Sequence, residues 1–319
     1  MFSDTTGKMP DSPGPRVWAV CGGKGGTGKS FLASQLAITQ ASRGRSVVLV
    51  DADPQGAGVH GLLGLAHRTP AFADCLYGEK PLVECLHRTQ VNNLRIVFGN
   101  AGTRPLPAFT HVKMERLCAQ MAELDAELVI MDLGGGMAPE ILDLFLSAHE
   151  SIAVTLPEMP ALENFFQFCR ALRFHTINRW LARESLSLQA ENIWEERPRE
   201  EIVDLNDLRH YLPAVIGRRG ASTRQVPSPP RVHLVLNHLT SIDEVQHGFS
   251  ILSLCRKHLD VHLSYAGYVE SEPKVWKKLS AVQGRPRIHI TPRIRLEILR
   301  IGKNLLHGRE LRIDSVLNV

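Results

Sequence analysis

Apolar residues occur along the chain in short, nearly continuous runs, and the stretches between these runs have helical spacing. The first run, RVWAVC, spans residues 16–21, and the later ones are residues 46–53, 93–99, 127–135, 151–157, 233–239 and 263–269. Continuous runs of Val, Ile and Leu separated by helices are typical of parallel strands covered on both faces. The pattern therefore predicts an α/β fold with a doubly wound, mostly parallel sheet, in which ligands bind at the carboxyl ends of the strands.

One segment interrupts this alternation. Residues 161–184 have the spacing of a long helix, and residues 185–231 are rich in both charges and end in a Gly/Ser/Pro loop. The expected apolar stripe of the helix contains Leu162, Phe165, Phe166, Cys169, Leu172 and Ile177. We predict that residues 173–231 are an inserted helical and loop segment between two core strands. A helical excursion with a mobile loop and a partner-binding element are both open interpretations of it.

The two ends of the chain limit the predicted domain. Residues 1–15 lack the apolar core of a signal peptide, and we expect them to form a disordered leader. Residues 16–308 are then a single domain, and residues 309–319 are a short tail. The chain contains no run of 18 or more apolar residues, so we expect no spanning helix and predict a cytoplasmic location.

Composition and charge exclude few classes of protein. Hydrophobic residues make up 44% of the 319 residues and charged residues 22%, which is the balance of an ordinary globular protein. The six cysteines form no CxxC pair and no Cys/His cluster, so we expect no metal or redox role for them. Residues 270–319 hold eleven Lys and Arg against five Asp and Glu, within a net charge of +4. This basic end could meet nucleic acid or anionic lipid, although a solvated surface explains it more simply.

The stretch CGGKGGTGKS, residues 21–30, predicts a phosphate-binding loop. Its pattern Gly23-x4-Gly28-Lys29-Ser30 follows a predicted strand and opens a predicted helix, as a P-loop requires. Glycines let backbone N–H groups turn onto phosphate oxygens, and the helix N-terminus adds a positive dipole. Lys29 is expected to reach the β- and γ-phosphates of ATP, and the Ser30 hydroxyl to be a Mg²⁺ ligand. The predicted nucleotide-binding residues here are Gly23, Gly25, Gly26, Thr27, Gly28, Lys29, Ser30 and Phe31.

Acidic residues end two of the predicted strands beside this loop. Asp132 closes ELVIMD in the position of a Walker B carboxylate, and we expect it to hold Mg²⁺ directly or through water. Asp51 and Asp53 end the SVVLVDAD strand at the same edge of the sheet. Asp53 is the better candidate to orient an attacking water, while Asp51 is expected to support Mg²⁺ or the loop. Helix capping is the simpler alternative for any one of the three.

These motifs together resemble the MinD/ParA family of ATPases. The loop KGGTGKS, with Lys24 at its first variable position, is similar to the deviant Walker A motif of that family, and DADPQG and DLGGG are similar to its two switch segments. The resemblance implies a P-loop NTPase of the SIMIBI-like class that hydrolyses ATP with Mg²⁺. It further implies that ATP drives formation of a homodimer, in which Lys24 reaches the partner subunit's ATP, and that Asn237 contacts adenine. Lys24, Lys29 and Asp53 are thus the expected catalytic residues.

Different motifs of the chain resemble different branches of this family. DPQG is similar to ParA partition proteins, whereas LLGL after it and the EMPALENFFQFCRAL region look more like MinD and the flagellar-number regulator FlhG. We favour the FlhG/MinD-like branch, which implies a switch that positions a flagellum, a division site or a similar structure. An activating or cargo protein and an anionic membrane surface at the inner face of the plasma membrane are then candidate partners. The apolar stripe of residues 293–308 is expected to belong to the last core helix rather than to face lipid.

Two other functions remain open at this point. A ParA-like partition ATPase would bind DNA, a less favoured partner for this chain. A metabolic P-loop ligase of the same fold would transfer phosphate to a small acid, and it would need a polar substrate pocket beside the γ-phosphate. Iron–sulfur members are not expected, because DLGGGMAPEI contains no cysteine. Cargo, surface and pathway are not readable from the sequence.

Overall fold

The computed structural model describes residues 14–53, 56, 58–100, 110–183, 204–208, 211–213, 226–272 and 290–312. The predicted leader at residues 1–15 lies almost wholly outside these ranges, as does most of the segment 184–225. The last seven residues of the predicted tail also lie outside them.

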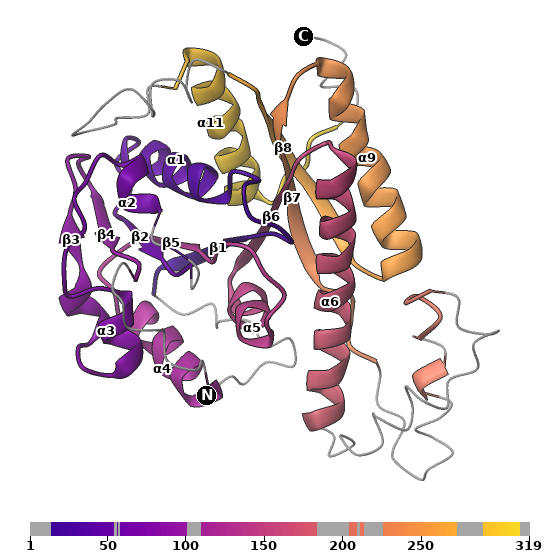
Figure 1. Cartoon of the computed structure of the whole chain (residues 1–319), viewed down its shortest axis with the longest axis horizontal. Coiled ribbons are helices and arrows are strands. Elements are labelled where there is room, and N and C mark those ends of the chain that lie inside the picture. The colour runs from indigo at the N-terminus through magenta and orange to yellow at the C-terminus, as the bar shows by residue number, and fades with distance from the viewer. Residues whose placement is uncertain are drawn as a thin grey trace.

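An eight-stranded sheet forms the centre of the molecule, in the order β3-β4-β2-β5-β1-β6-β7-β8 (Figure 1). Every neighbouring pair is parallel except β3 and β4, which are antiparallel. The strands are β1 (Arg16–Cys21), β2 (Val47–Asp51), β3 (His87–Arg88), β4 (Leu94–Val97), β5 (Leu128–Asp132), β6 (Glu150–Thr155), β7 (Arg231–Leu239) and β8 (His262–Glu270). The mostly parallel sheet and seven of its strands confirm the prediction from the apolar runs. The two-residue β3 was not predicted, because so short a strand carries no apolar run.

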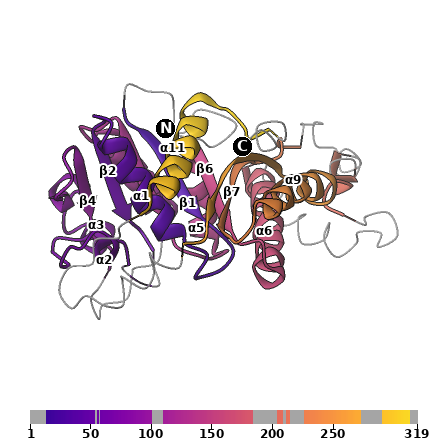
Figure 2. The same ribbon diagram turned by 90° about the horizontal axis from the view of Figure 1, so that it is seen from above.

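Helices cover both faces of this sheet, as a doubly wound fold requires (Figures 1 and 2). On one face lie α1 (Lys29–Ala41), α2 (Val59–Leu62) and α11 (Pro292–His307), whose buried residues share one core cluster. The other cluster contains residues of α3 (Phe72–Tyr77), α4 (His111–Ala122), α5 (Pro139–Ser147), α6 (Met159–Arg183) and α9 (Val245–Leu254). Short helical turns also occur at Leu82–Cys85, Ile242–Glu244 and Cys255–Leu259.

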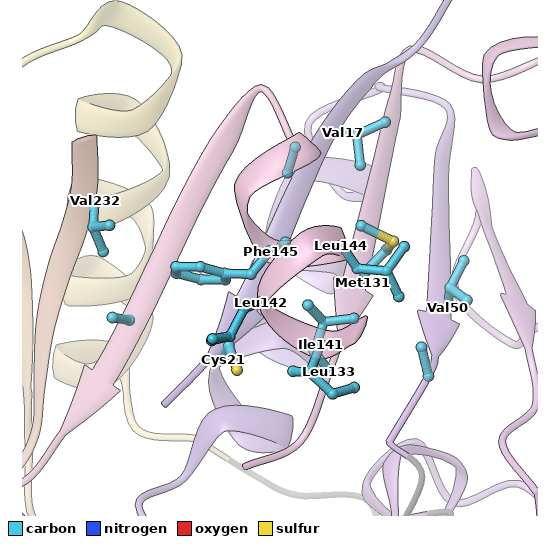
Figure 3. Packing of buried hydrophobic residues seen from close by; sticks show 14 of the residues in the cluster. Val17, Cys21, Val50, Met131, Leu133, Ile141, Leu142, Leu144, Phe145 and Val232 are labelled. Atoms are coloured by element: carbon cyan, nitrogen blue, oxygen red, sulfur yellow. The ribbon is translucent and has the colours of Figure 1, made fainter. Parts of the chain in front are cut away.

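The central strands are buried along their whole length, which explains their uninterrupted apolar sequence. All five residues of β2 and all five of β5 are buried, including the acids at their ends. Figure 3 shows Ile141, Leu142 and Phe145 of α5 packed beside Cys21 of β1 and other residues of the same cluster. Desolvation of this kind drives folding with about 25 cal/mol per Å² of apolar surface. All six cysteines are buried and unpaired, so none of them forms a disulfide.

Helix α11 is a core helix, as expected from its apolar stripe. Its first turn is capped by Thr291, whose side chain accepts a hydrogen bond from the Ile294 N–H, and its end is closed by Gly308 at a φ of 59°. The stripe of Ile294, Ile298, Ile301 and Leu305 is buried against α1 and β8. This stripe therefore cannot face lipid in the present fold. None of the helices within the described ranges combines the length and hydropathy needed to cross a membrane.

Helix α6 spans 25 residues and follows β6 along the chain. The expected stripe is largely buried: Phe165, Cys169, Leu172 and Ile177 are buried, and Leu162 and Phe166 are half-buried. Near its end, Ile177 and Leu181 form a small separate core with Leu205, Leu208 and Leu212. The described parts of the predicted 173–231 insertion thus pack on the C-terminal half of α6.

Candidate functional site: a phosphate-binding loop and paired aspartates

The loop between β1 and α1 has the shape that a P-loop needs. Gly28 precedes α1 in the left-handed region, with a φ of 87°. A Cβ atom there would lie 2.0 Å from Nδ2 of Asn237, and a Cβ atom on Gly23 would lie 2.2 Å from the backbone oxygen of Asn164 in α6. Both contacts are far shorter than real Cβ atoms tolerate. Close packing therefore requires glycine at these two positions of the motif.

Lys29 is turned into the loop and is 5% exposed. Its Nζ atom donates to the backbone oxygen of Lys24 at 2.6 Å and lies 3.5 Å from the Thr27 hydroxyl. Burial lowers the pKa of Lys29 from its ordinary value, while Cys21, Asp132 and Asp53 act in the opposite direction. A cation held in this way, over backbone N–H groups at a helix N-terminus, suits a polyphosphate anion.

Lys24 lies in a different environment. It occupies the exposed outer part of the loop together with Gly25 and Gly26. Its backbone, rather than its side chain, is fixed, because its carbonyl accepts the hydrogen bond from Lys29. The structure thus separates the two lysines of the motif: one points into the loop, and the other lies at its surface.

The acids that end β2 and β5 are brought together as the sequence predicted. Asp51 and Asp132 are partners in the parallel register, and neither has any exposed surface. Oδ2 of Asp51 accepts from the Val59 N–H at 3.2 Å, and Oδ1 of Asp132 accepts from the Gly134 N–H at 3.3 Å. The other carboxylate oxygen of each, Oδ1 of Asp51 and Oδ2 of Asp132, has no hydrogen-bond partner within the described part of the chain. Two orphaned buried oxygens on adjacent strands are costly without a ligand.

Burial also changes the acidity of this pair. Desolvation, reinforced by the neighbouring Asp132, raises the pKa of Asp51 to about 8. Desolvation raises the pKa of Asp132 to about 6, against hydrogen bonds from Ser30 and Gly134 and the charge of Lys29. Since a divalent cation would supply the missing ligand for both orphaned oxygens, the donor set fits Mg²⁺ held by carboxylate and hydroxyl oxygens. Among the residues described, no group of three or more His, Cys, Asp or Glu is placed to hold a metal alone. Mg²⁺ typically takes only one or two carboxylates, with phosphate and water oxygens for the rest.

The loop after β5 lies against both Asp53 and the P-loop. A Cβ atom on Gly134, which has a φ of 67°, would lie 2.2 Å from Cγ of Asp53. The next glycine, Gly135, packs on the backbone of Lys24, and the Gly136 N–H donates to the Gly22 oxygen at 3.1 Å. Asp53 is partly exposed. The structure thus brings the three predicted segments, P-loop, DAD strand end and DLGGG, into direct contact.

Asn237 and Phe31 were both predicted to contact the nucleotide, and both side chains are buried in the structure. Asn237, expected at adenine, is 6% exposed and donates from Nδ2 to the Thr27 backbone oxygen at 2.9 Å. This bond ties β7 to the P-loop, and the adenine contact stays a prediction. The side chain of Phe31 lies in the core, 4% exposed, so its predicted role can involve only its backbone N–H.

Sequence reasoning missed two residues that shape the site. Gly99 follows β4, and a Cβ atom on it would lie 2.7 Å from Cγ of Asp51. Asn164 supplies the backbone oxygen that approaches Gly23. A signal for Gly99 was present, because it ends a predicted strand at the same sheet edge as Asp51. No signal existed for Asn164, since its contact depends on how α6 crosses the sheet.

Comparison with known proteins agrees with this geometry. Residues 18–173 match the family model of the CobQ/CobB/MinD/ParA nucleotide binding domain. The antiactivator FleN of Pseudomonas aeruginosa is 28% identical over 168 residues, which cover 52% of this chain and 59% of FleN. The chromosome partitioning protein ParA of Caulobacter vibrioides is 38% identical over 87 residues, 27% of this chain and 33% of ParA. The matched region spans about half to three-fifths of the length of the first curated relatives.

Solved structures show the same fold over most of the chain. The septum site-determining protein MinD of Pyrococcus horikoshii, complexed with Mg-ADP, superposes with a TM-score of 0.58 at 15% identity, over 92% of this chain and 98% of that one. A plasmid partition protein of Borrelia burgdorferi bound to AMPPNP gives a TM-score of 0.56 at 16% identity, over 92% and 99% of the two chains. At these identities the likeness concerns the fold. Residues 18–173 therefore form a CobQ/CobB/MinD/ParA nucleotide binding domain, in a chain that has the fold of the MinD and ParA ATPases.

Proposed function

We propose that the protein is a Mg²⁺-dependent ATPase that forms a homodimer with ATP and acts as a nucleotide-operated switch. The observation that carries this proposal is the separation of the two P-loop lysines, with Lys29 buried in the loop and Lys24 exposed at its rim. A single phosphate site needs only the first. An exposed second lysine beside the phosphates can serve a second subunit placed face to face.

Each residue of the site has its own role in the proposed reaction. Lys29 and the loop N–H groups bind the β- and γ-phosphates and offset their charge. Ser30, Asp132 and Asp51 would hold Mg²⁺, which would neutralise phosphate charge. Asp53 orients the attacking water, and its contact with Gly134 keeps the two switch segments together.

The dimer follows from the position of Lys24. Two ATP-bound copies meeting at their P-loops would repel each other through their phosphates, and a lysine from each copy lowers that repulsion. Hydrolysis removes the γ-phosphate and with it the contact that holds the two subunits. ATP therefore controls the assembly state, which is what a positioning switch requires.

Light scattering coupled to size-exclusion chromatography tests the proposal. The Asp53→Ala variant, which should bind ATP without turnover, is compared with and without Mg·ATP. We expect a monomer without nucleotide and a dimer with it. Adding Lys24→Ala should keep ATP binding and abolish the dimer. Lys303→Ala, a change of another exposed lysine in α11, is the matched control. A protein that stays monomeric when saturated with Mg·ATP would refute the switch.

We infer that the function is positioning, as the relatives named FleN and MinD suggest, with an activating or cargo protein as partner. A complex of MinC with MinD from Aquifex aeolicus has this fold and illustrates such a partner. Because the stripe of α11 is buried, a membrane contact would have to use other residues. Flotation with anionic vesicles and Mg·ATP tests that contact, and protein left unbound excludes it.

DNA partition is the second candidate, and the ParA relative and the Borrelia partition structure favour it. ATP-dependent, sequence-independent and strongly salt-dependent binding to duplex DNA would support it over positioning. A phosphate-transferring ligase also stays open, because the matched family includes CobQ and CobB. Turnover that requires an added carboxylic acid would identify a ligase.

A further inference from the structure

A cavity lies on the helical face formed by α1, α2 and α11, and no P-loop residue lines it. It has a volume of about 520 Å³ and is bounded by the C-terminal half of α1, the end of α2, the turn between β3 and β4, and the first half of α11. These elements lie together on one side of the sheet (Figures 1 and 2). The volume falls within the range of small-molecule sites, about 300–1,000 Å³.

The lining of this cavity is amphipathic, and its charged residues within the described part of the chain are cationic. Its apolar wall consists of Ile38, Leu62, Leu63, Val91, Ile290 and Leu299. Arg43 and Arg295 are its charged residues, and no Asp or Glu among the described residues lines the cavity. Both arginines are exposed, and neither forms an ion pair with any residue that the structure describes. An apolar wall beneath two cations fits a ligand with an apolar body and an anionic head.

A buried polar group in the wall points to a ligand independently of this charge. Gln35 lines the cavity, is 2% exposed, and its Nε2 atom has no hydrogen-bond partner in the described part of the molecule. An unsatisfied buried donor costs about 1–3 kcal/mol unless something accepts from it. The neighbouring Thr39 and Ser42 add hydroxyl groups to the same helix face. A ligand with an acceptor oxygen would satisfy the Gln35 amide.

We propose that this cavity binds a small amphipathic anion, a molecule with an apolar chain or ring and one carboxylate or phosphate group. The apolar body lies against Leu62, Leu63 and Leu299, and the anionic head lies between Arg43 and Arg295. The site uses none of the nucleotide-binding residues, so it is separate from the ATP site and does not depend on its function.

Isothermal titration with octanoate and octyl phosphate below their micelle concentrations tests this site on the full chain. Octanol and octyltrimethylammonium are the neutral and cationic probes of the same chain length. We expect both anions to bind with one site per chain, and the neutral and cationic probes to bind at least tenfold more weakly. The ratio of the two anion affinities distinguishes a carboxylate ligand from a phosphate ligand.

Two variants locate the site. Arg43→Gln with Arg295→Gln changes only exposed side chains and should weaken octanoate binding tenfold or more. Leu62→Trp should fill the cavity and abolish binding. The matched controls are Arg256→Gln and Leu254→Trp, which make the same changes on exposed positions at the far end of the sheet. The proposal is overturned if neither anion binds, if the cation binds as well as the anions, or if the double arginine variant binds octanoate like the parent protein.

Discussion

The buried pair of Asp51 and Asp132 makes the stability of the nucleotide-free protein depend on pH in a predictable way. Burial together with the neighbouring Asp132 raises the pKa of Asp51 from 3.8 to about 8 in the folded protein. Between these values the folded state keeps a proton that the unfolded chain has lost. Stability therefore falls as pH rises from about 4 to 8. Replacing Asp51 by Asn removes this titration while preserving the shape of the side chain.

The size of the effect follows from the pKa values. At 1.36 kcal/mol per pKa unit, the Asp51 titration lowers the free energy of unfolding by roughly 4 kcal/mol between pH 5 and pH 8. The pKa of Asp132, raised by burial to about 6, contributes roughly 1 kcal/mol over the same interval. Asp51→Asn should therefore gain roughly 4 kcal/mol relative to the parent protein on going from pH 5 to pH 8. Groups that titrate equally in both proteins cancel in this difference.

Urea denaturation at pH 5 and pH 8, in EDTA and without nucleotide, measures this difference in the free energy of unfolding between Asp51→Asn and the parent protein. Asp243→Asn, an isosteric change at an exposed acid, is the control and should follow the parent protein at both pH values. If Asp51→Asn and the parent protein change in parallel between the two pH values, Asp51 of the folded protein holds no proton that the unfolded chain has lost. The electrostatic description of the site would then be wrong.

Four further variants test other contacts. Lys29→Ala should abolish ATP binding in calorimetry, because the phosphates lose their buried cation; measurable affinity would contradict this. Asp53→Ala should keep ATP affinity within about twofold and lower turnover a hundredfold or more, and normal turnover would identify another water-orienting group. Asn237→Ala removes the bond to the Thr27 oxygen and should cost about 1–3 kcal/mol in denaturant unfolding while weakening ATP binding. Asp143→Ala breaks the contacts to His175 and Arg179 and should cost about 1–3 kcal/mol, with unchanged stability as the contrary result.

The sequence predicted the sheet and the P-loop because both are encoded locally. The runs at residues 46–53 and 127–135 are apolar because their strands are covered on both faces, and each ends in acids at the edge where parallel strands meet. That rule predicts that Asp51 and Asp132 lie together, as they do in the parallel register. It also placed the last core helix, since the stripe of residues 293–308 can be read from its spacing.

The remaining features of the site depend on contacts between distant parts of the chain. Asn237 bonds to a loop 210 residues away, so its role in fixing the P-loop backbone has no local signature. The orphaned oxygens of the two aspartates likewise follow from register and burial, which the composition of a strand does not specify. The two-residue β3 forms only because it pairs with β4 in a hairpin.

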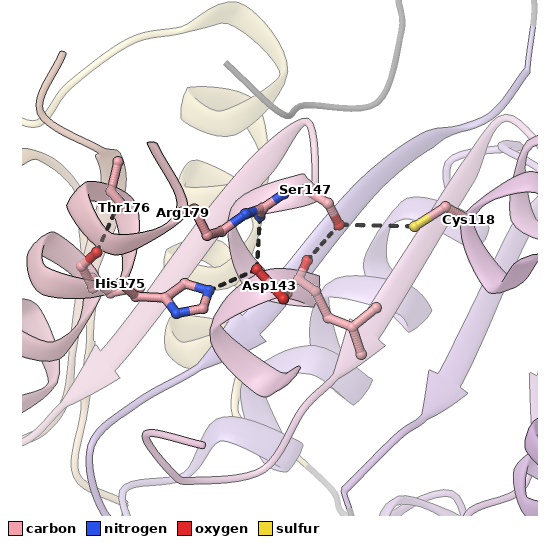
Figure 4. A network of polar contacts seen from close by, with 8 residues as sticks. Cys118, Asp143, Ser147, His175, Thr176 and Arg179 are labelled. Carbon is pink, nitrogen blue, oxygen red and sulfur yellow. Dashed lines mark hydrogen bonds and ion pairs between the residues drawn. The ribbon is translucent and has the colours of Figure 1, made fainter. Parts of the chain in front are cut away.

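These distant contacts form a closed ring around the nucleotide site. The glycines after β5 lie on the P-loop, through Gly135 against Lys24 and the hydrogen bond from Gly136, and they lead directly into α5. Asp143 of α5 accepts from His175 at 2.6 Å and from Arg179 at 2.7 Å, both in α6 (Figure 4). Helix α6 returns to the P-loop through the backbone oxygen of Asn164.

A shift in any one of these elements must therefore move the next or break a named contact, since packed interiors leave no free space. The glycine loop leads into α5, α5 contacts α6, and the far end of α6 carries the small core. The described part of the 173–231 segment rests on that core. Asp143 is one link between α5 and α6, and the ring contact of Phe145 with Phe168 is another. Both links lie between the glycine loop after β5 and the small core at the far end of α6.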